Sequence, residues 1–169
     1  MKKINKIILT AVIALSSLNF TFAQSKVAHI NTQELVASMP EMNTAKAELE
    51  KLAKTYETDI QTMAAELQSK VKQYDTEAPN QTDEENQKRL QEVQGMEQSI
   101  RQYQQQAQSD LQKKEFDLLK PISEKAQAAI ITVANAQGFD YVLDSTQGQG
   151  VILANGKDLM ADVKSELGF

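Results

Sequence analysis

The sequence predicts an α+β protein in which a long antiparallel helical hairpin projects from a small β-sheet body. Between about Met42 and Val133 the apolar residues recur at helical spacing, with one break at residues 78–81. Short strand-like segments at residues 26–31 and 139–144 flank this helical region. Two helices of roughly 50 Å and 80 Å cannot be enclosed in a globule with a radius on the order of 15 Å. We therefore expect the hairpin to project.

The first 23 residues have the pattern of a cleaved signal peptide. Three lysines precede an apolar run over residues 7–18, and Thr21-Phe22-Ala23 is a small-x-small cleavage pattern that makes Gln24 the expected mature start. The apolar run is short for a bilayer-spanning helix, so a retained anchor is the lesser alternative. We expect export across one membrane. The absence of cysteine excludes disulfides and thiolate metal sites.

Charge and composition argue against several function classes. Removal of the first 23 residues leaves 15 basic and 23 acidic side chains, a net charge of −8. An acidic chain without a basic patch argues against nucleic-acid binding. His29 is the only histidine and has no cysteine to partner, so we expect it to be structural. We therefore expect no enzyme activity, no cofactor and no metal site.

The N-terminal part of the body is predicted from capping patterns. A strand over Val27–Ile30 leads to Asn31, which can cap a short helix with Glu34 at the third position. Residues 38–41, Ser-Met-Pro-Glu, form a second capping box with Pro40 in the first helical turn.

The two long helices carry matching apolar patterns. In the first, the spacing repeats every eleven residues, which favours a straight or slightly right-handed pairing; its apolar positions are Leu49, Leu52, Tyr56, Ile60, Met63, Leu67, Val71 and Tyr74. Proline ends this helix at residues 78–80, and a capping box at residues 82–85 opens the return helix. The return helix shows the same spacing from Ile100 onward, so the two should form an antiparallel coiled coil. We expect Gly95 to be a flexing point or simply tolerated, and Pro121 to bend the helix.

Some apolar residues of the hairpin have two interpretations. At helical spacing they most often pack in the seam between helices, whereas flexible or aromatic side chains can also face a cavity and contact apolar clients. The residues in question are Met63, Leu67, Tyr74, Met96, Ile100 and Tyr103.

The C-terminal part of the body should add two strands and a helix. Gly138 ends the return helix, strands follow at residues 139–144 and 151–154, and Asp158 caps a helix over residues 159–167. So small a sheet is marginal alone and exposes its edges, so we expect several copies to join around a symmetry axis. The residues expected to be buried by this assembly are Val27, Ile30, Val142, Leu143, Val151, Ile152 and Leu153.

The order of these segments resembles the Skp/OmpH family of periplasmic chaperones. The resemblance rests on residues 26–32, on Pro121-Ile122 late in the return helix, on residues 133–144 and on residues 156–163. It implies a homotrimer with a β-body at residues 24–41 and 119–169. Residues 42–118 would form a projecting hairpin, with its tip near residues 75–85. Three such arms would surround a cavity that holds unfolded outer-membrane proteins without ATP.

The tip departs from the basic arms that the resemblance implies. Residues 75–85 read Asp-Thr-Glu-Ala-Pro-Asn-Gln-Thr-Asp-Glu-Glu, which argues against docking on membranes or lipopolysaccharide. Client binding through apolar contacts is less affected. The leading hypothesis is an ATP-independent holdase chaperone of the periplasm. The alternative is a non-chaperone coiled-coil scaffold that bridges envelope partners, which the periodicity alone does not exclude.

Overall fold

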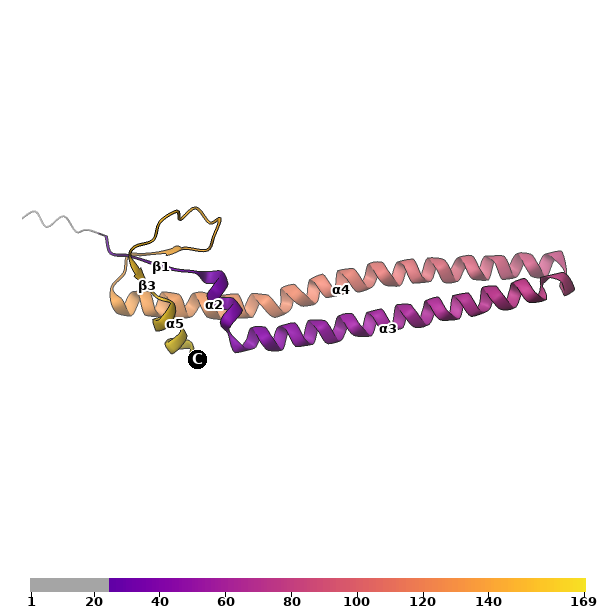
Figure 1. The fold of residues 1–169 in the computed structure, drawn as a ribbon, viewed down its shortest axis with the longest axis horizontal. Helices are drawn as coiled ribbons and strands as arrows, with labels where there is room; N and C mark the ends of the chain where they lie inside the picture. Colours follow the sequence, from indigo (N-terminus) through magenta and orange to yellow (C-terminus); the bar gives the residue numbers. More distant parts are fainter. Residues whose placement is uncertain (1–24) are drawn as a thin grey trace, which may run out of the picture.

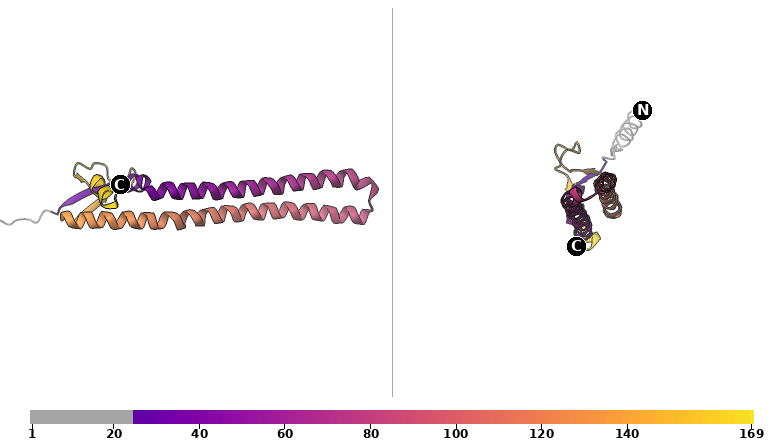
Figure 2. Two further views of the ribbon diagram at one scale, coloured as in Figure 1. Left: turned by 90° about the horizontal axis from the view of Figure 1, so that it is seen from below. Right: turned by 90° about the vertical axis from the view of Figure 1, so that its right-hand side faces the viewer.

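The structure, a computed structural model, describes residues 25–169, and the predicted signal peptide lies outside this range. Two long helices dominate the molecule: α3 (Pro40–Glu77) has 38 residues and α4 (Asp83–Gln137) has 55. A short 3-10 turn, η1 (Ala78–Asn80), joins them, and α4 returns alongside α3 (Figures 1 and 2). The remaining elements gather around the last turns of α4. The long helices therefore extend well beyond the body, as the sequence predicts.

Local signals in the sequence set the ends of α4. Thr82 is the N-cap, and its Oγ1 accepts a hydrogen bond from the backbone N–H of Glu85 at 3.2 Å. At the other end Gly138 adopts φ 68°, a left-handed conformation that glycine reaches without steric cost. Its N–H donates to the carbonyls of Ala134 and Asn135. Both caps confirm the prediction from the sequence.

The body contains a three-stranded parallel sheet in the order β2-β1-β3. The central strand is β1 (Val27–Ile30), with β2 (Tyr141–Asp144) on one side and the two-residue β3 (Lys157–Asp158) on the other. Two short helices complete the body: α2 (Thr32–Ser38) follows β1, and α5 (Met160–Leu167) follows β3. The strands are distant in sequence, so the sheet fixes both ends of the chain to the end of α4.

One face of the sheet packs on the helices and forms the core. Ala28 and Ile30 are buried, whereas their neighbour Val27 is exposed, because alternate side chains of a strand point to opposite faces. Leu35, Leu159 and other side chains from α2 to α5 close this core against the last third of α4; the other buried members are Met39, Ala45, Ile122, Ala126, Ala129, Val133, Ala134 and Val163.

A hydrogen-bond network holds the first turn of α2 against the end of β2. The first three N–H groups of the helix donate in order to the Asp144 carboxylate (3.3 Å), to Thr146 Oγ1 (3.3 Å) and to Asn31 Oδ1 (2.9 Å). The fourth, of Leu35, donates to the Asn31 carbonyl. The Leu35 bond is the first bond of the helix itself, and the three N–H groups before it, which have no partner within a helix, are all satisfied. Asn31 is the cap that the sequence predicts, whereas Asp144 and Thr146 come from 112 or more residues away.

Three local predictions are wrong. Residues 151–154 form no strand, and β3 lies instead at Lys157–Asp158. Gly148 and Gly150, both at φ 89°, lead the chain into an open loop, and β1 already has neighbours on both edges. The N-cap of α3 is Met39 rather than Ser38, whose hydroxyl donates to the Leu35 carbonyl of the preceding helix.

The third wrong prediction concerns α5, whose N-cap is Leu159. Asp158 belongs to β3, yet its carboxylate still accepts from the N–H of Met160 at 2.8 Å. The predicted chemistry is therefore present one residue before the cap position.

Candidate functional site

The arm, residues 42–118, has a continuous apolar seam between α3 and α4. All eight apolar positions predicted for α3 are half-buried. On α4 the same holds for Val93, Met96, Ile100 and Tyr103, and Ala107 is buried, whereas Leu90 stays 54% exposed. Within the described residues no third element covers the arm, so its seam remains partly open to solvent. A seam of this kind stabilises the pair of helices and leaves apolar surface accessible along it.

Two tyrosines cross the middle of the seam in opposite directions. Tyr56 of α3 donates to Asp110 of α4 at 2.8 Å, and Tyr103 of α4 donates to Asp59 of α3 at 2.6 Å. The hydrogen bond to Asp59 and burial raise the pKa of Tyr103 to about 12. The bond to Asp110 raises the pKa of Tyr56 in the same way. Both phenols therefore stay protonated at neutral pH and act as donors between the helices.

A second polar cluster fastens the arm near its tip. Lys70 reaches Glu92 at 2.6 Å, and Tyr74 also donates to Glu92. Lys70 and Tyr74 together lower the pKa of Glu92, which remains charged. Arg89 pairs with Glu77 at 2.7 Å and lies 4.6 Å from the Tyr74 ring centre. These contacts hold the two helices together next to the turn.

The structure places all six candidate client-facing residues in the seam. Tyr74 and Tyr103 are committed to the polar contacts just described, and Met63, Leu67, Met96 and Ile100 are half-buried. Gly95 lies on the exposed side of α4, and a Cβ placed there would meet nothing within 4 Å. Pro121 lies inside α4, which continues through it as one helix.

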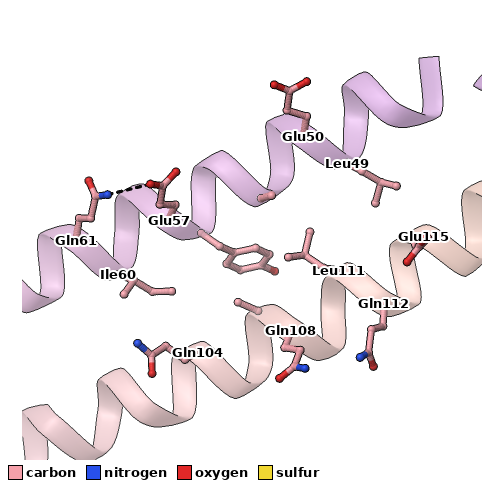
Figure 3. A pocket seen from close by; sticks show the side chains of 13 residues that line it. Leu49, Glu50, Glu57, Ile60, Gln61, Gln104, Gln108, Leu111, Gln112 and Glu115 are labelled. Carbon is pink, nitrogen blue, oxygen red and sulfur yellow. Dashed lines mark hydrogen bonds between the residues drawn. The ribbon is translucent and has the colours of Figure 1, made fainter. Parts of the chain in front are cut away.

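A groove of about 780 Å³ lies along one side of the arm, between α3 and α4 (Figure 3). Its floor is apolar and includes two alanines, whose side chains are short, one on each helix. The floor residues are Leu49, Ala53, Tyr56, Ile60, Ala107 and Leu111. We call this feature the groove. The sequence did not predict the groove, because its lining comes from two helices and depends on their relative register.

The rim of the groove carries carboxylates and amides. Glu50 and Glu57 stand on α3, and Glu115 stands on α4, and no lysine or arginine lines the groove. Gln104, Gln108 and Gln112 follow one another along the α4 edge, as Figure 3 shows. The groove therefore combines an apolar floor with an acidic, hydrogen-bonding rim.

The sheet has one open face. Val27, Tyr141 and Leu143 are 42%, 60% and 46% exposed, and the register of β1 with β2 puts them on the same side, together with His29. We call these four residues the open sheet face. The loop between β2 and β3 adds Ile152 and Leu153, which are 101% and 76% exposed. A monomer with this much exposed apolar surface would be prone to association.

Two residues predicted for the assembly interface lie inside the subunit instead. Ile30 is 1% exposed, and Val142 packs against the core, because both point to the helix-covered face of the sheet. Val151 is half-buried. The predicted residues that remain exposed and could contact another copy are Val27, Leu143, Ile152 and Leu153. Tyr141 is also exposed, although the sequence did not predict it for the interface.

Within residues 25–169 no helix is both long and apolar enough to cross a membrane. The same residues contain no group of three or more acidic or histidine side chains placed to hold a metal ion. His29 lies in the central strand, where its carbonyl accepts from Leu159 N–H at 3.0 Å. This geometry gives His29 a structural position in the sheet.

The chain is mostly helical, with a small parallel sheet in the body and two long helices in the arm. Residues 26–167 match the family described as outer membrane protein (OmpH-like), and the chain belongs to this family. A crystal structure of an OmpH-like protein from Caulobacter crescentus CB15, itself proposed to be an outer membrane chaperone, has a similar fold with a TM-score of 0.77. The two share 18% sequence identity, and the match covers 85% of this chain and 84% of the other. No curated protein matches the sequence.

Proposed function

We propose that this protein is an ATP-independent holdase chaperone of the periplasm. It would bind unfolded outer-membrane proteins between helical arms and prevent their aggregation before membrane insertion. Membership in the OmpH-like family supports a role of this kind. The predicted signal peptide, which lies outside the described residues, supports export. In this proposal the protein has no catalytic activity and needs no cofactor.

The observation that carries the proposal is the accessible apolar surface on a projecting arm. At a rise of about 1.5 Å per residue, α3 and the part of α4 that lies beside it reach more than 50 Å from the body. Glu48, near the start of α3, pairs with Lys114 in the middle of α4, whereas Lys70, near the end of α3, pairs with Glu92 near the start of α4. This order of contacts supports an antiparallel coiled-coil hairpin. Such an arm offers many weak apolar contacts to an unfolded chain and requires no particular client sequence.

The open sheet face supports a homotrimer. Three copies could cover Val27, Tyr141 and Leu143 around one axis, and the loop residues Ile152 and Leu153 could reach a neighbouring copy. Residues 151–154 have no strand partner among residues 25–169, so a neighbour's sheet edge could supply one. Three arms on such a body would enclose a space, which a single arm cannot do.

The acidic tip makes docking on anionic membranes or lipopolysaccharide doubtful. Lys88 and Arg89, on the α4 side of the tip, are paired with Glu84 and Glu77 at 3.0 Å and 2.7 Å. The remaining exposed charges of residues 75–85 are carboxylates. The proposal therefore assigns client binding to the arm and no membrane contact to the tip.

Light scattering of a denatured outer-membrane barrel diluted from urea tests the proposal. Equimolar trimer of the mature protein should suppress aggregation without ATP. Unchanged aggregation at a several-fold excess would remove the holdase function. The alternative, an envelope scaffold, predicts tight binding to one folded partner instead. Capture experiments with folded envelope proteins and with unfolded barrels as separate baits distinguish the two.

A further inference from the structure

The groove has features that select one kind of occupant. Along α3 it runs from Leu49 to Ile60, a distance of roughly 16 Å at helical rise. An extended peptide advances about 3.3 Å per residue, so the groove accommodates about five residues. In an extended peptide alternate side chains point to the same side, so about three of them would contact the apolar floor. The floor therefore suits a short segment in which apolar residues alternate with polar ones.

The glutamines of the rim match the repeat of an extended backbone. Gln104, Gln108 and Gln112 are four residues apart, which separates them by about 6.0 Å along α4. In an extended chain, peptide groups that point to the same side recur about every 6.6 Å. The mismatch over three glutamines is little more than 1 Å, which a flexible side chain can absorb.

The same glutamines are free to bond a ligand. Gln106 is occupied by its bond to Asp110 at 2.7 Å, whereas Gln104, Gln108 and Gln112 bond no side chain among residues 25–169. A side-chain amide both donates and accepts hydrogen bonds. It can therefore satisfy the N–H or C=O groups of any peptide segment without reading its sequence.

The negative charge of the rim favours peptides that carry positive charges. Glu57 is paired with Lys54 at 2.8 Å, but Glu50 and Glu115 have no cationic partner among the described residues. A segment with lysine or arginine beside its apolar residues would pair with these carboxylates. An acidic segment would be repelled.

We propose that the groove is a peptide-binding site for extended segments with alternating apolar residues and flanking cations, held by its glutamine row through the peptide backbone. This inference rests on the proposed chaperone function and assigns its client contacts to one place on the arm. It gives the glutamines a specific role, in which they satisfy the backbone of a client that has no secondary structure. Strands of membrane barrels have such alternating patterns before they fold.

Fluorescence anisotropy of short labelled peptides with the mature full-length protein tests the site. The probe is a lysine-flanked peptide in which valine and phenylalanine alternate with threonine. A second peptide has the same composition in helical spacing, and a third has glutamates at its ends. We expect the first to bind at least about fivefold more tightly than the other two. Equal binding of the helix-patterned peptide would overturn the extended mode, and equal binding of the acidic one would overturn the role of the rim.

Matched variants test the residues. The triple variant Gln104→Ala, Gln108→Ala, Gln112→Ala should weaken binding of the alternating peptide about tenfold. The control Gln94→Ala, Gln98→Ala, Gln102→Ala has the same spacing on exposed positions of the same helix, outside the groove. It should bind as the unaltered protein does. Equal losses in both variants would contradict the proposed glutamine row.

Filling the groove provides an independent test. Ala53→Phe should block peptide binding, whereas Ala65→Phe, at an exposed position of α3 outside the groove, should not. Normal peptide binding by Ala53→Phe would show that the peptide does not bind in the groove. A change of oligomeric state in this variant would also overturn the proposal, because the groove would then be an interface between copies. Suppression of barrel aggregation is measured on the same variants. Full suppression without peptide binding would refute the groove alone, whereas no suppression by the unaltered protein would refute the chaperone function.

Discussion

The rings of Tyr56 and Tyr103 meet edge to face across the two long helices, with centroids 5.7 Å apart and planes at 64°. Each hydroxyl donates to an aspartate on the opposite helix, Asp110 for Tyr56 and Asp59 for Tyr103. The pair thus joins aromatic packing to two polar bonds at one level of the arm. It fixes the register of α3 against α4 where a purely apolar seam could slide.

Removal of one hydroxyl tests this registration. Tyr103→Phe keeps the ring but leaves Asp59 without its partner, so thermal unfolding should shift down by a few degrees. Phe116→Tyr, the reverse exchange at a 64% exposed position of the same helix, is the control. It should leave the Tm unchanged. Equal Tm values for the two variants would contradict the structural role of the Tyr103 hydroxyl.

Arg89 should be essential for order at the tip. Its side chain is only 15% exposed and contacts Glu77 and the Tyr74 ring, so Arg89→Ala should increase hydrogen exchange over residues 74–90. The neighbouring Lys88 is 64% exposed in its pair with Glu84, and Lys88→Ala should change exchange little. Equal hydrogen exchange over residues 74–90 in the two variants would contradict the role of Arg89 at the tip.

The Asp144 network predicts a specific loss of stability in acid. Burial alone would raise the pKa of Asp144, but hydrogen bonds from Thr146 and Thr32 outweigh it and lower the pKa from 3.8 to about 2. A lowered folded-state pKa stabilises the folded protein above the unfolded-state pKa, and this contribution is lost as pH falls from about 4 through 2. Urea unfolding across this range should show the decline.

In Asp144→Asn that part of the pH dependence should be flatter, and stability at neutral pH should be lower. Asp75→Asn, at an exposed position on the arm, is the control and should keep the decline of the unaltered protein. A decline of the same size in Asp144→Asn would show that another group causes it.

Gly95 allows a test of whether the arm must flex. A Cβ there meets no neighbour, and alanine favours a helix by about 1 kcal/mol over glycine, so Gly95→Ala should raise stability by roughly that amount. If flexing helps to accommodate clients, the same variant should suppress barrel aggregation less well. Higher stability with unchanged suppression would mean that glycine is only tolerated here.

The open sheet face should be needed for assembly. Leu143→Asp places a charge among exposed apolar side chains, so sedimentation velocity should show dissociation to single chains. Leu90→Asp alters an equally exposed leucine on the arm, 54% exposed, and should leave the oligomer intact. Retention of the oligomer by Leu143→Asp would exclude this face as the interface.

Local signals explain why the long elements were predictable. Eleven-residue apolar spacing located the seam, and Thr82 and Gly138 located the ends of α4, because caps act through neighbouring residues. The third strand was not predictable in this way, since residues 151–154 have a strand-like composition but no partner in the described part of the chain. Pairing is a tertiary property.

In the candidate site, too, local features were predictable from the sequence and tertiary contacts were not. The periodicity identified Tyr74 and Tyr103 as residues at the seam, but their partners Glu92 and Asp59 depend on the register of the two helices. The groove is lined from both helices, by Ala53 of α3 and Ala107 of α4 among others, so the pattern of one helix alone does not reveal it. The role of Asp144 at α2 likewise arises from the fold rather than from adjacent residues.

Native mass spectrometry of the mature protein, alone and with an unfolded outer-membrane barrel, tests the central claim most directly. We predict a mass of three chains that increases by one barrel when the client is added, because only joined bodies bring several arms around one space. A single-chain mass at every concentration, with no bound barrel, would contradict it.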